Sequence, residues 1–223
     1  MEEKEFFKYF DHTILKATTT REALLAVCEE AKRYGFCAVA VNTAMIPDCA
    51  AFLAGSDVRP DAAVGFPLGI TSIACKLREA EEAIANGAQE IDYVIHIGKI
   101  KEGDVAYIRD EMEQIVGLCR QKGVVSKVIF ENCYLTDEEK IALCEIANAV
   151  RPDFIKTSTG FGPSSATVED VALMRKHADP AIRVKAAGGI RDLKTCLSMI
   201  EAGADRIGCS CCPAIAEEYK NNF

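Results

Sequence analysis

The sequence has no long apolar run and no excess of positive charge, and each absence excludes a class of protein. No apolar run approaches the roughly 18 residues of a membrane span, and the N-terminal MEEKEFFKYF is acidic and lacks the apolar segment of a signal peptide. The formal charge is −8, whereas a nucleic-acid or acidic-membrane surface needs clustered positive charge. We therefore expect a cytoplasmic protein that binds neither nucleic acid nor membrane and has a small-molecule partner.

Linker-like segments are also missing. No stretch rich in proline, glycine or serine, no charge block and no low-complexity tract interrupts the chain. With 223 residues, 49% of them apolar, the chain can bury one sizeable core. We expect a single domain over residues 1–223; the sequence does not fix the oligomeric state and leaves a homodimer open.

Metal-binding patterns are sparse, although the chain has eleven cysteines. Most are single residues in apolar positions, which is typical of reduced thiols used as small core side chains. The one cluster, Cys209, Cys211 and Cys212, has neither two C-x-x-C pairs nor the nearby histidines of a zinc site. The sequence therefore favours a chain without a metal.

What the chain does have is a recurring helix followed by a strand. The segment TTREALLAVCEEAKRYG predicts a helix in which Thr19 and Glu22 form a capping box and Gly35 is the stop. The apolar run FCAVAV follows at once and predicts a strand. The same order returns at residues 73–87 and 90–95, at 105–123 and 127–130, and at 192–203 and 205–208.

The predicted strands are short, continuous and rich in valine and isoleucine, as parallel strands covered by helices must be. Their ends fall at intervals of 23 to 39 residues, near Asp11, Asn42, Gly65, Asp92, Glu131, Lys156, Lys185 and Gly208. Eight such units predict an α/β fold, a (β/α)₈ TIM barrel. An open doubly wound sheet is the alternative, but DHTILKATTT after the first strand lacks the phosphate-binding glycines typical of that fold.

Two lysines terminate consecutive predicted strands, Lys156 in FIKTSTG and Lys185 in VKAAGG. Catalytic groups of such a barrel lie at the carboxyl ends of its strands. A second cation and partial burial both lower the pKa of a lysine, and the neutral amine can form a Schiff base. The alternative is that each lysine extends into solvent or forms a structural ion pair.

Two carboxylates interrupt apolar strands, Asp92 in EIDYVIHIG and Asp11 in FDHTIL. A buried carboxylate is costly without a cation or a proton-transfer role. Asp92 is the candidate acid/base, because imine chemistry must move protons to and from carbon, and Asp11 is a candidate substrate-binding residue. The structural alternatives are that Asp92 neutralises a lysine and Asp11 caps a turn.

Glycine-containing loops after the last three strands predict a phosphate site. Barrels of this fold commonly bind phosphate through backbone N–H groups of the loops after strands seven and eight. The candidates are Gly160 in STGFG, Gly188 and Gly189 in AAGGIRD, and Gly208 and Ser210 in IGCSC. The alternative is that these glycines only permit tight turns.

The chain resembles the deoxyribose-phosphate aldolase family from DHTILK to RIGCS. The motifs VGFPLG, EIDYVIHIGKIKEGD, KVIFENCYLT, FIKTSTGFG, ATVEDVALMR and VKAAGGIRD occur in the family's order. The resemblance implies reversible cleavage of 2-deoxy-D-ribose 5-phosphate, a sugar phosphate, to D-glyceraldehyde 3-phosphate and acetaldehyde without metal or cofactor. It implies that Lys156 is the Schiff-base lysine, Lys185 the cation that lowers its pKa, and Asp92 the proton relay.

The chain departs from the family's Gly-Thr-Ser-Ser-Gly pattern after the last strand, where it has Gly208 to Cys212 with three cysteines. His96 also replaces a usual asparagine and Thr43 a usual proline. An imine-forming aldolase with a different, unphosphorylated acceptor is therefore a second hypothesis, and a non-catalytic sugar-phosphate binding protein is a third. Tyr219 is a candidate C-terminal tyrosine near the site, or else a packed helix residue.

Overall fold

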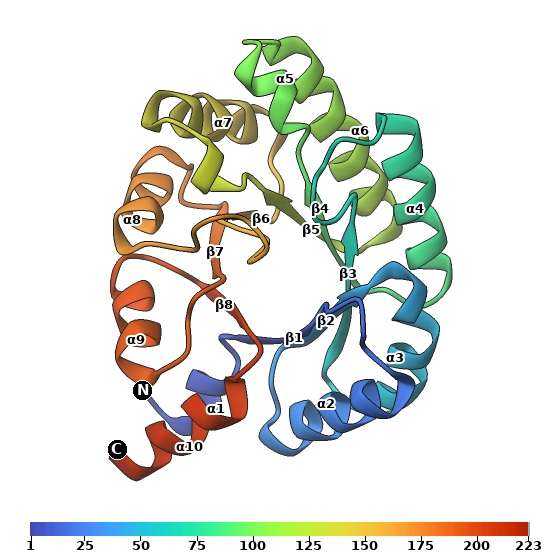
Figure 1. Ribbon diagram of the computed structural model, residues 1–223, viewed down its shortest axis with the longest axis vertical. Coiled ribbons are helices and arrows are strands. Elements are labelled where there is room, and N and C mark those ends of the chain that lie inside the picture. Colours follow the sequence, from blue (N-terminus) through green and yellow to red (C-terminus); the bar gives the residue numbers. More distant parts are fainter. Residues whose placement is uncertain (223) are drawn as a thin grey trace.

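Parallel strands close into a barrel at the centre of the molecule (Figure 1). The structure is a computed structural model and describes residues 1–222. Each strand pairs in parallel with its neighbours in the chain, and β1 pairs with β8. The strands are β1 (Phe10–Ile14), β2 (Ala38–Asn42), β3 (Arg59–Val64), β4 (Glu90–Val94), β5 (Val125–Ile129), β6 (Phe154–Lys156), β7 (Arg183–Ala187) and β8 (Arg206–Cys209). The predicted eight-stranded barrel is confirmed, because the β1–β8 pairing excludes an open sheet.

Helices surround the barrel on its outside (Figure 1). They are α1 (Glu3–Phe7), α2 (Arg21–Tyr34), α3 (Ile46–Leu53), α4 (Ile73–Ala85), α5 (Ile97–Lys101), α6 (Val105–Lys122), α7 (Asp137–Val150), α8 (Val168–His177), α9 (Leu193–Glu201) and α10 (Cys212–Asn222), with short 3₁₀ turns η1 (Thr43–Met45) and η2 (Asn132–Tyr134). Over residues 1–222, none of them is both long enough and apolar enough to cross a bilayer.

The start of α2 differs from the sequence prediction by one residue. Thr20, not Thr19, caps the helix, because its hydroxyl accepts a hydrogen bond from the Ala23 N–H at 3.2 Å. The Thr19 hydroxyl donates instead to the Lys16 carbonyl at 2.7 Å. The predicted stop is confirmed: Gly35 adopts a left-handed conformation with φ 70°, which glycine tolerates without strain.

In several strands, charged side chains point into the barrel interior and alternate with apolar side chains that face the helices. In β4, Ile91 and Tyr93 belong to the apolar core, whereas Glu90 and Asp92 alternate with them and point to the opposite face. The strands also extend beyond Asp11, Asp92 and Lys185. These three residues lie within β1, β4 and β7 and not at the strand ends, which corrects that part of the prediction.

Of the two readings of Tyr219 that the sequence left open, the structure supports the packed helix residue. Its ring stacks on that of Phe6 with centroids 3.9 Å apart, and its hydroxyl donates to the Met1 carbonyl at 2.6 Å. Through Tyr219, α10 therefore packs against the N-terminal segment that contains Met1 and Phe6.

Candidate active site

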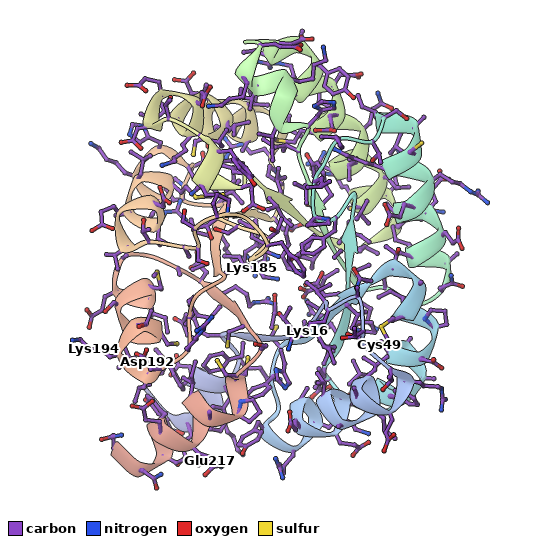
Figure 2. The ribbon with its side chains drawn as sticks, viewed as in Figure 1. Lys16, Cys49, Lys185, Asp192, Lys194 and Glu217 are labelled. Atoms are coloured by element: carbon purple, nitrogen blue, oxygen red, sulfur yellow. The ribbon has the colours of Figure 1, made fainter. Side chains whose placement is uncertain are left out.

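Eight charged side chains are buried together in the interior of the barrel. Four are acidic and four are basic, so their formal charges balance when all are ionised. They are Asp11, Asp61, Glu90, Asp92, Lys127, Lys156, Lys185 and Arg206. Figure 2 shows Lys185 inside the ring of helices, whereas Lys194 and Glu217 lie at its periphery.

Asp92 joins three lysines. Its Oδ2 lies 2.6 Å from the Nζ of Lys156 and 2.7 Å from the Nζ of Lys185. Its Oδ1 accepts a hydrogen bond from the Nζ of Lys127 at 2.6 Å. Burial alone would raise the pKa of Asp92, but these ammonium groups hold it well below its usual range. Asp92 is therefore a carboxylate at neutral pH.

Lys156 ends β6 and is almost fully buried, with 4% of its surface exposed. Its register partner on β7 is Lys185, so the two lysines lie side by side as expected from the sequence. Burial lowers the pKa of Lys156, the Asp92 carboxylate opposes that effect, and the Lys185 ammonium adds to it. The net pKa of Lys156 is below the ordinary lysine value.

Lys185 has the opposite electrostatic character. Its Nζ lies 2.5 Å from Asp11, 2.7 Å from Asp92 and 3.2 Å from Asp61. Burial lowers the pKa of Lys185, but the carboxylates outweigh burial and raise it above the ordinary value. Lys185 is therefore a permanent cation beside Lys156. Asp11, a sequence candidate for substrate binding, contacts Lys185 and Arg206 in the interior.

A second group of charged residues completes the network, and sequence reasoning missed it. The Nζ of Lys127 lies 2.7 Å from both Asp61 and Glu90. Arg206 Nη1 contacts Asp11 at 2.6 Å and Glu90 at 3.2 Å. Burial raises the pKa of Asp61 to about 6, and the nearby Asp92 carboxylate adds to that effect.

Three of these carboxylates resemble a cation site. One oxygen each of Asp11, Asp61 and Glu90 lies within 4.8 Å of the others, and such oxygen donors suit divalent cations. The Lys127 ammonium and the Arg206 guanidinium contact these same carboxylates. The protein's own cations therefore neutralise the cluster.

The glycine candidates lie in two groups. Gly160, Gly188 and Gly189 have φ values of 86°, 82° and 74°, and a Cβ on Gly188 would lie 3.1 Å from the Gly160 Cα. The loops after β6 and β7 therefore touch. Gly208 lies within β8, where a Cβ would come within 3.1 Å of the Lys185 Cε, so this glycine makes room for the lysine. Ser210 is exposed just beyond β8.

The cysteine cluster lies at the junction of β8 and α10. The Sγ atoms of Cys209 and Cys212 are 3.1 Å apart, and the Cys211 thiol donates to the Ile190 carbonyl at 3.3 Å. Burial raises the pKa of the Cys212 thiol, which keeps it protonated at neutral pH.

Comparison with known proteins assigns the family. The model of the DeoC/LacD family aldolases matches residues 6–216. The chain belongs to the DeoC/LacD aldolase family. It is 50% identical over 210 residues to the deoxyribose-phosphate aldolase of Bacteroides thetaiotaomicron, covering 94% of this chain and 88% of that protein. Identity to the deoxyribose-phosphate aldolase of Aciduliprofundum boonei is also 50%, over 94% of this chain and 95% of that one.

Solved structures of this aldolase family have the same fold. The deoxyribose-phosphate aldolase of Aeropyrum pernix, described as a tetramer, superimposes with a TM-score of 0.92 at 28% identity, covering 100% of this chain and 94% of that one. The family resemblance found in the sequence is thus confirmed, and the protein is an aldolase, an enzyme of the lyase class.

Proposed function

We propose that this aldolase reversibly cleaves 2-deoxy-D-ribose 5-phosphate to D-glyceraldehyde 3-phosphate and acetaldehyde through a Schiff base on Lys156. The observation that carries the proposal is the pair of lysines on one carboxylate oxygen, with Lys156 shifted towards the neutral amine and Lys185 towards the cation. The names of the relatives support the choice of substrate.

The network lets Lys156 lose its proton at low cost. Asp92 keeps Lys127 on one oxygen and Lys185 on the other when Lys156 becomes neutral. The carboxylate therefore stays paired in the low-dielectric interior, where an unpaired charge would be expensive. The neutral amine of Lys156 is then free to attack an aldehyde.

The chemistry then follows from an electron sink. Lys156 condenses with C1 of the open-chain sugar and releases water, which leaves a protonated imine. Loss of the C3 hydroxyl proton breaks the C2–C3 bond, and its electron pair moves towards the imine nitrogen to give an enamine and D-glyceraldehyde 3-phosphate. Protonation of the enamine carbon and addition of water release acetaldehyde and free Lys156. Asp92 would relay these protons through a water molecule.

The phosphate end of the substrate would lie on the glycine loops. Backbone N–H groups near Gly160, Gly188 and Gly189 are the candidate donors, with Ser210 beyond β8. The cysteines that follow Gly208 remove a hydroxyl and a glycine from this region, which favours a second candidate function, an aldolase with an unphosphorylated acceptor. Comparing kcat/KM for 2-deoxyribose 5-phosphate and 2-deoxyribose distinguishes the two functions.

Borohydride trapping tests the proposed imine. The protein is reduced in the presence of 2-deoxyribose 5-phosphate, and its peptides are analysed by mass spectrometry. We expect a reduced adduct on Lys156 and none at that position in Lys156→Met. Ligand binding without modification of any lysine would instead identify a non-catalytic sugar-phosphate binding protein.

A further inference from the structure

Glu131 follows β5 in a backbone conformation that side-chain-bearing residues rarely adopt. Its φ is 57°, in the left-handed region, and it is buried with 2% of its surface exposed. The residues on either side of it hold the neighbouring strand: Phe130 N–H donates to the Lys156 carbonyl and Asn132 N–H to the Thr157 carbonyl, each at 2.9 Å. The unusual turn therefore sits directly beside the candidate Schiff-base lysine.

The Glu131 side chain is committed to a single residue of the loop after β6. Its Oε1 accepts a hydrogen bond from the Thr159 N–H at 3.1 Å, and its Oε2 accepts one from the Thr159 hydroxyl. That hydroxyl oxygen in turn accepts from the Phe161 N–H at 3.0 Å. Over residues 1–222, no basic side chain forms an ion pair with Glu131. Glu131 Oε1 also accepts a long hydrogen bond from the Cys133 thiol at 3.8 Å. Glu131 thus holds Thr159 directly and Phe161 through the Thr159 hydroxyl.

The far side of the same loop packs closely on the segment that carries Glu131. A Cβ on Gly162 would lie 2.6 Å from the Cys133 Sγ and 3.5 Å from the Glu131 Cδ. Between these two attachments, Gly160 faces Gly188 of the next loop. Two contacts therefore fix the position of Gly160: the hydrogen bonds of Glu131 to Thr159, and the packing of Gly160 on Gly188 in the loop after β7.

We propose that Glu131 is a positioning residue that holds the Thr159–Phe161 loop so that the backbone N–H of Gly160 binds the substrate's phosphate. The inference rests on the proposed function, because it concerns the phosphate end of that substrate. Removing the carboxylate frees the Thr159 N–H and hydroxyl, and Gly160 is no longer held in place beside Gly188 of the next loop. Lys156 keeps its own contacts with Asp92 and its strand hydrogen bonds.

The test compares a phosphorylated and an unphosphorylated substrate in three variants. Glu131→Ala removes both hydrogen bonds, Glu131→Gln keeps an oxygen acceptor and the shape, and Glu138→Ala is a matched control on the exposed first turn of α7. We expect Glu131→Ala to raise KM for 2-deoxyribose 5-phosphate about tenfold or more. In Glu131→Ala we expect kcat/KM for 2-deoxyribose and borohydride trapping with acetaldehyde to stay within about threefold of the unaltered protein. Glu131→Gln should have a KM for 2-deoxyribose 5-phosphate between those of Glu131→Ala and the unaltered protein. Glu138→Ala should leave all three quantities unchanged.

Equal losses with both sugars would overturn the proposal, because Glu131 would then act on Lys156 or on the fold. Unchanged kinetics, or equal use of the two sugars by the unaltered protein, would overturn it as well. If Glu131→Ala does not fold by circular dichroism, Thr159→Val must raise the same KM selectively, since it removes one of the two hydrogen bonds and keeps the shape. Failure of the proposed function is distinguished in the unaltered protein, where acetaldehyde would leave no adduct on Lys156.

Discussion

Buried lysines occur in two regions of this molecule, the barrel interior and the layer of helices around it, and the pKa values of Lys76 in the helix layer and Lys127 in the barrel move in opposite directions. Lys76 of α4 is buried against Glu111 of α6, with Nζ and Oε1 2.6 Å apart. Burial lowers the pKa of Lys76 despite that partner. In the barrel, burial also disfavours the charged form of Lys127, but the carboxylates around it raise its pKa well above the ordinary value. The number of carboxylates, not the depth of burial, therefore decides the direction.

Lys156 lies in the barrel, but its pKa is lowered as that of Lys76 is. A single carboxylate, Asp92, contacts its Nζ within 4 Å, as Glu111 alone contacts Lys76. Lys185 next to it has three carboxylates, and its pKa is raised. A nucleophilic lysine thus arises where one member of a charged network is left with too few counter-charges.

Replacing Lys156, which has only one carboxylate partner, should lower turnover the most. We expect Lys156→Met to lower kcat by at least about a thousandfold, because the electron sink is lost, while the fold remains. Steady-state cleavage of 2-deoxyribose 5-phosphate measures the loss, with the more exposed Lys101→Met as control. Residual turnover within tenfold of the unaltered protein would place the imine on another lysine.

Removing the carboxylate of Asp92, which Lys127, Lys156 and Lys185 share, should have the next largest effect on turnover. We expect Asp92→Asn to lower kcat by about 10²- to 10⁴-fold, the usual contribution of general acid–base catalysis. Exchange of the acetaldehyde methyl protons in D₂O, followed by NMR, isolates the proton transfers. Trapping that persists on Lys156 while exchange slows would identify a proton relay; exchange at the unaltered rate would contradict that role.

Removing the neighbouring cation should change the pH dependence more than the maximal rate. In Lys185→Met the positive charge that disfavours protonation of Lys156 is gone, so the pKa of Lys156 rises and less neutral amine is present at a given pH. We expect about a hundredfold lower turnover at pH 7 and an acid limb of kcat/KM displaced to higher pH. Lys185→Arg keeps the charge and should keep the limb in place; an unmoved limb in Lys185→Met would argue against the pKa role.

The sequence predicted the barrel and the lysine pair because both depend on local patterns. Glycine-terminated helices alternate with short apolar strands, and residues that end consecutive parallel strands become neighbours, as the Lys156–Lys185 register confirms. The exact start of α2 could not be predicted, because Thr19 and Thr20 are adjacent and either can cap a helix. In the structure the hydrogen bond from the Ala23 N–H shows that Thr20 is the cap.

Four of the inner charges, Asp61, Glu90, Lys127 and Arg206, were missed because their partners are distant in the chain. Glu90 and Asp92 are two residues apart in a strand, a spacing that puts both on one face, and this signal was available. Their partners were not, since Arg206 and Asp11 are separated by 195 positions and Lys127 meets Asp92 across 35. The sequence left two readings of Tyr219 open for the same reason, because its partner Phe6 lies at the other end of the chain.

Replacing Lys76, the partner of Glu111 in the helix layer, should lower the stability of the fold. It should leave turnover within about twofold, which is the smallest kinetic effect of the substitutions considered. Lys76→Met leaves the Glu111 carboxylate buried without its cation, which costs about 3–5 kcal/mol of unfolding free energy, and adding Glu111→Leu should recover much of it. Burial already raises the pKa of Glu111 above its ordinary value, so the folded variant takes up a proton more readily than the unfolded chain. Its stability should therefore fall as pH rises, with a larger deficit in urea unfolding at pH 8 than at pH 5. Equal deficits at the two pH values would mean that lost packing, not the unpaired charge, destabilises the variant.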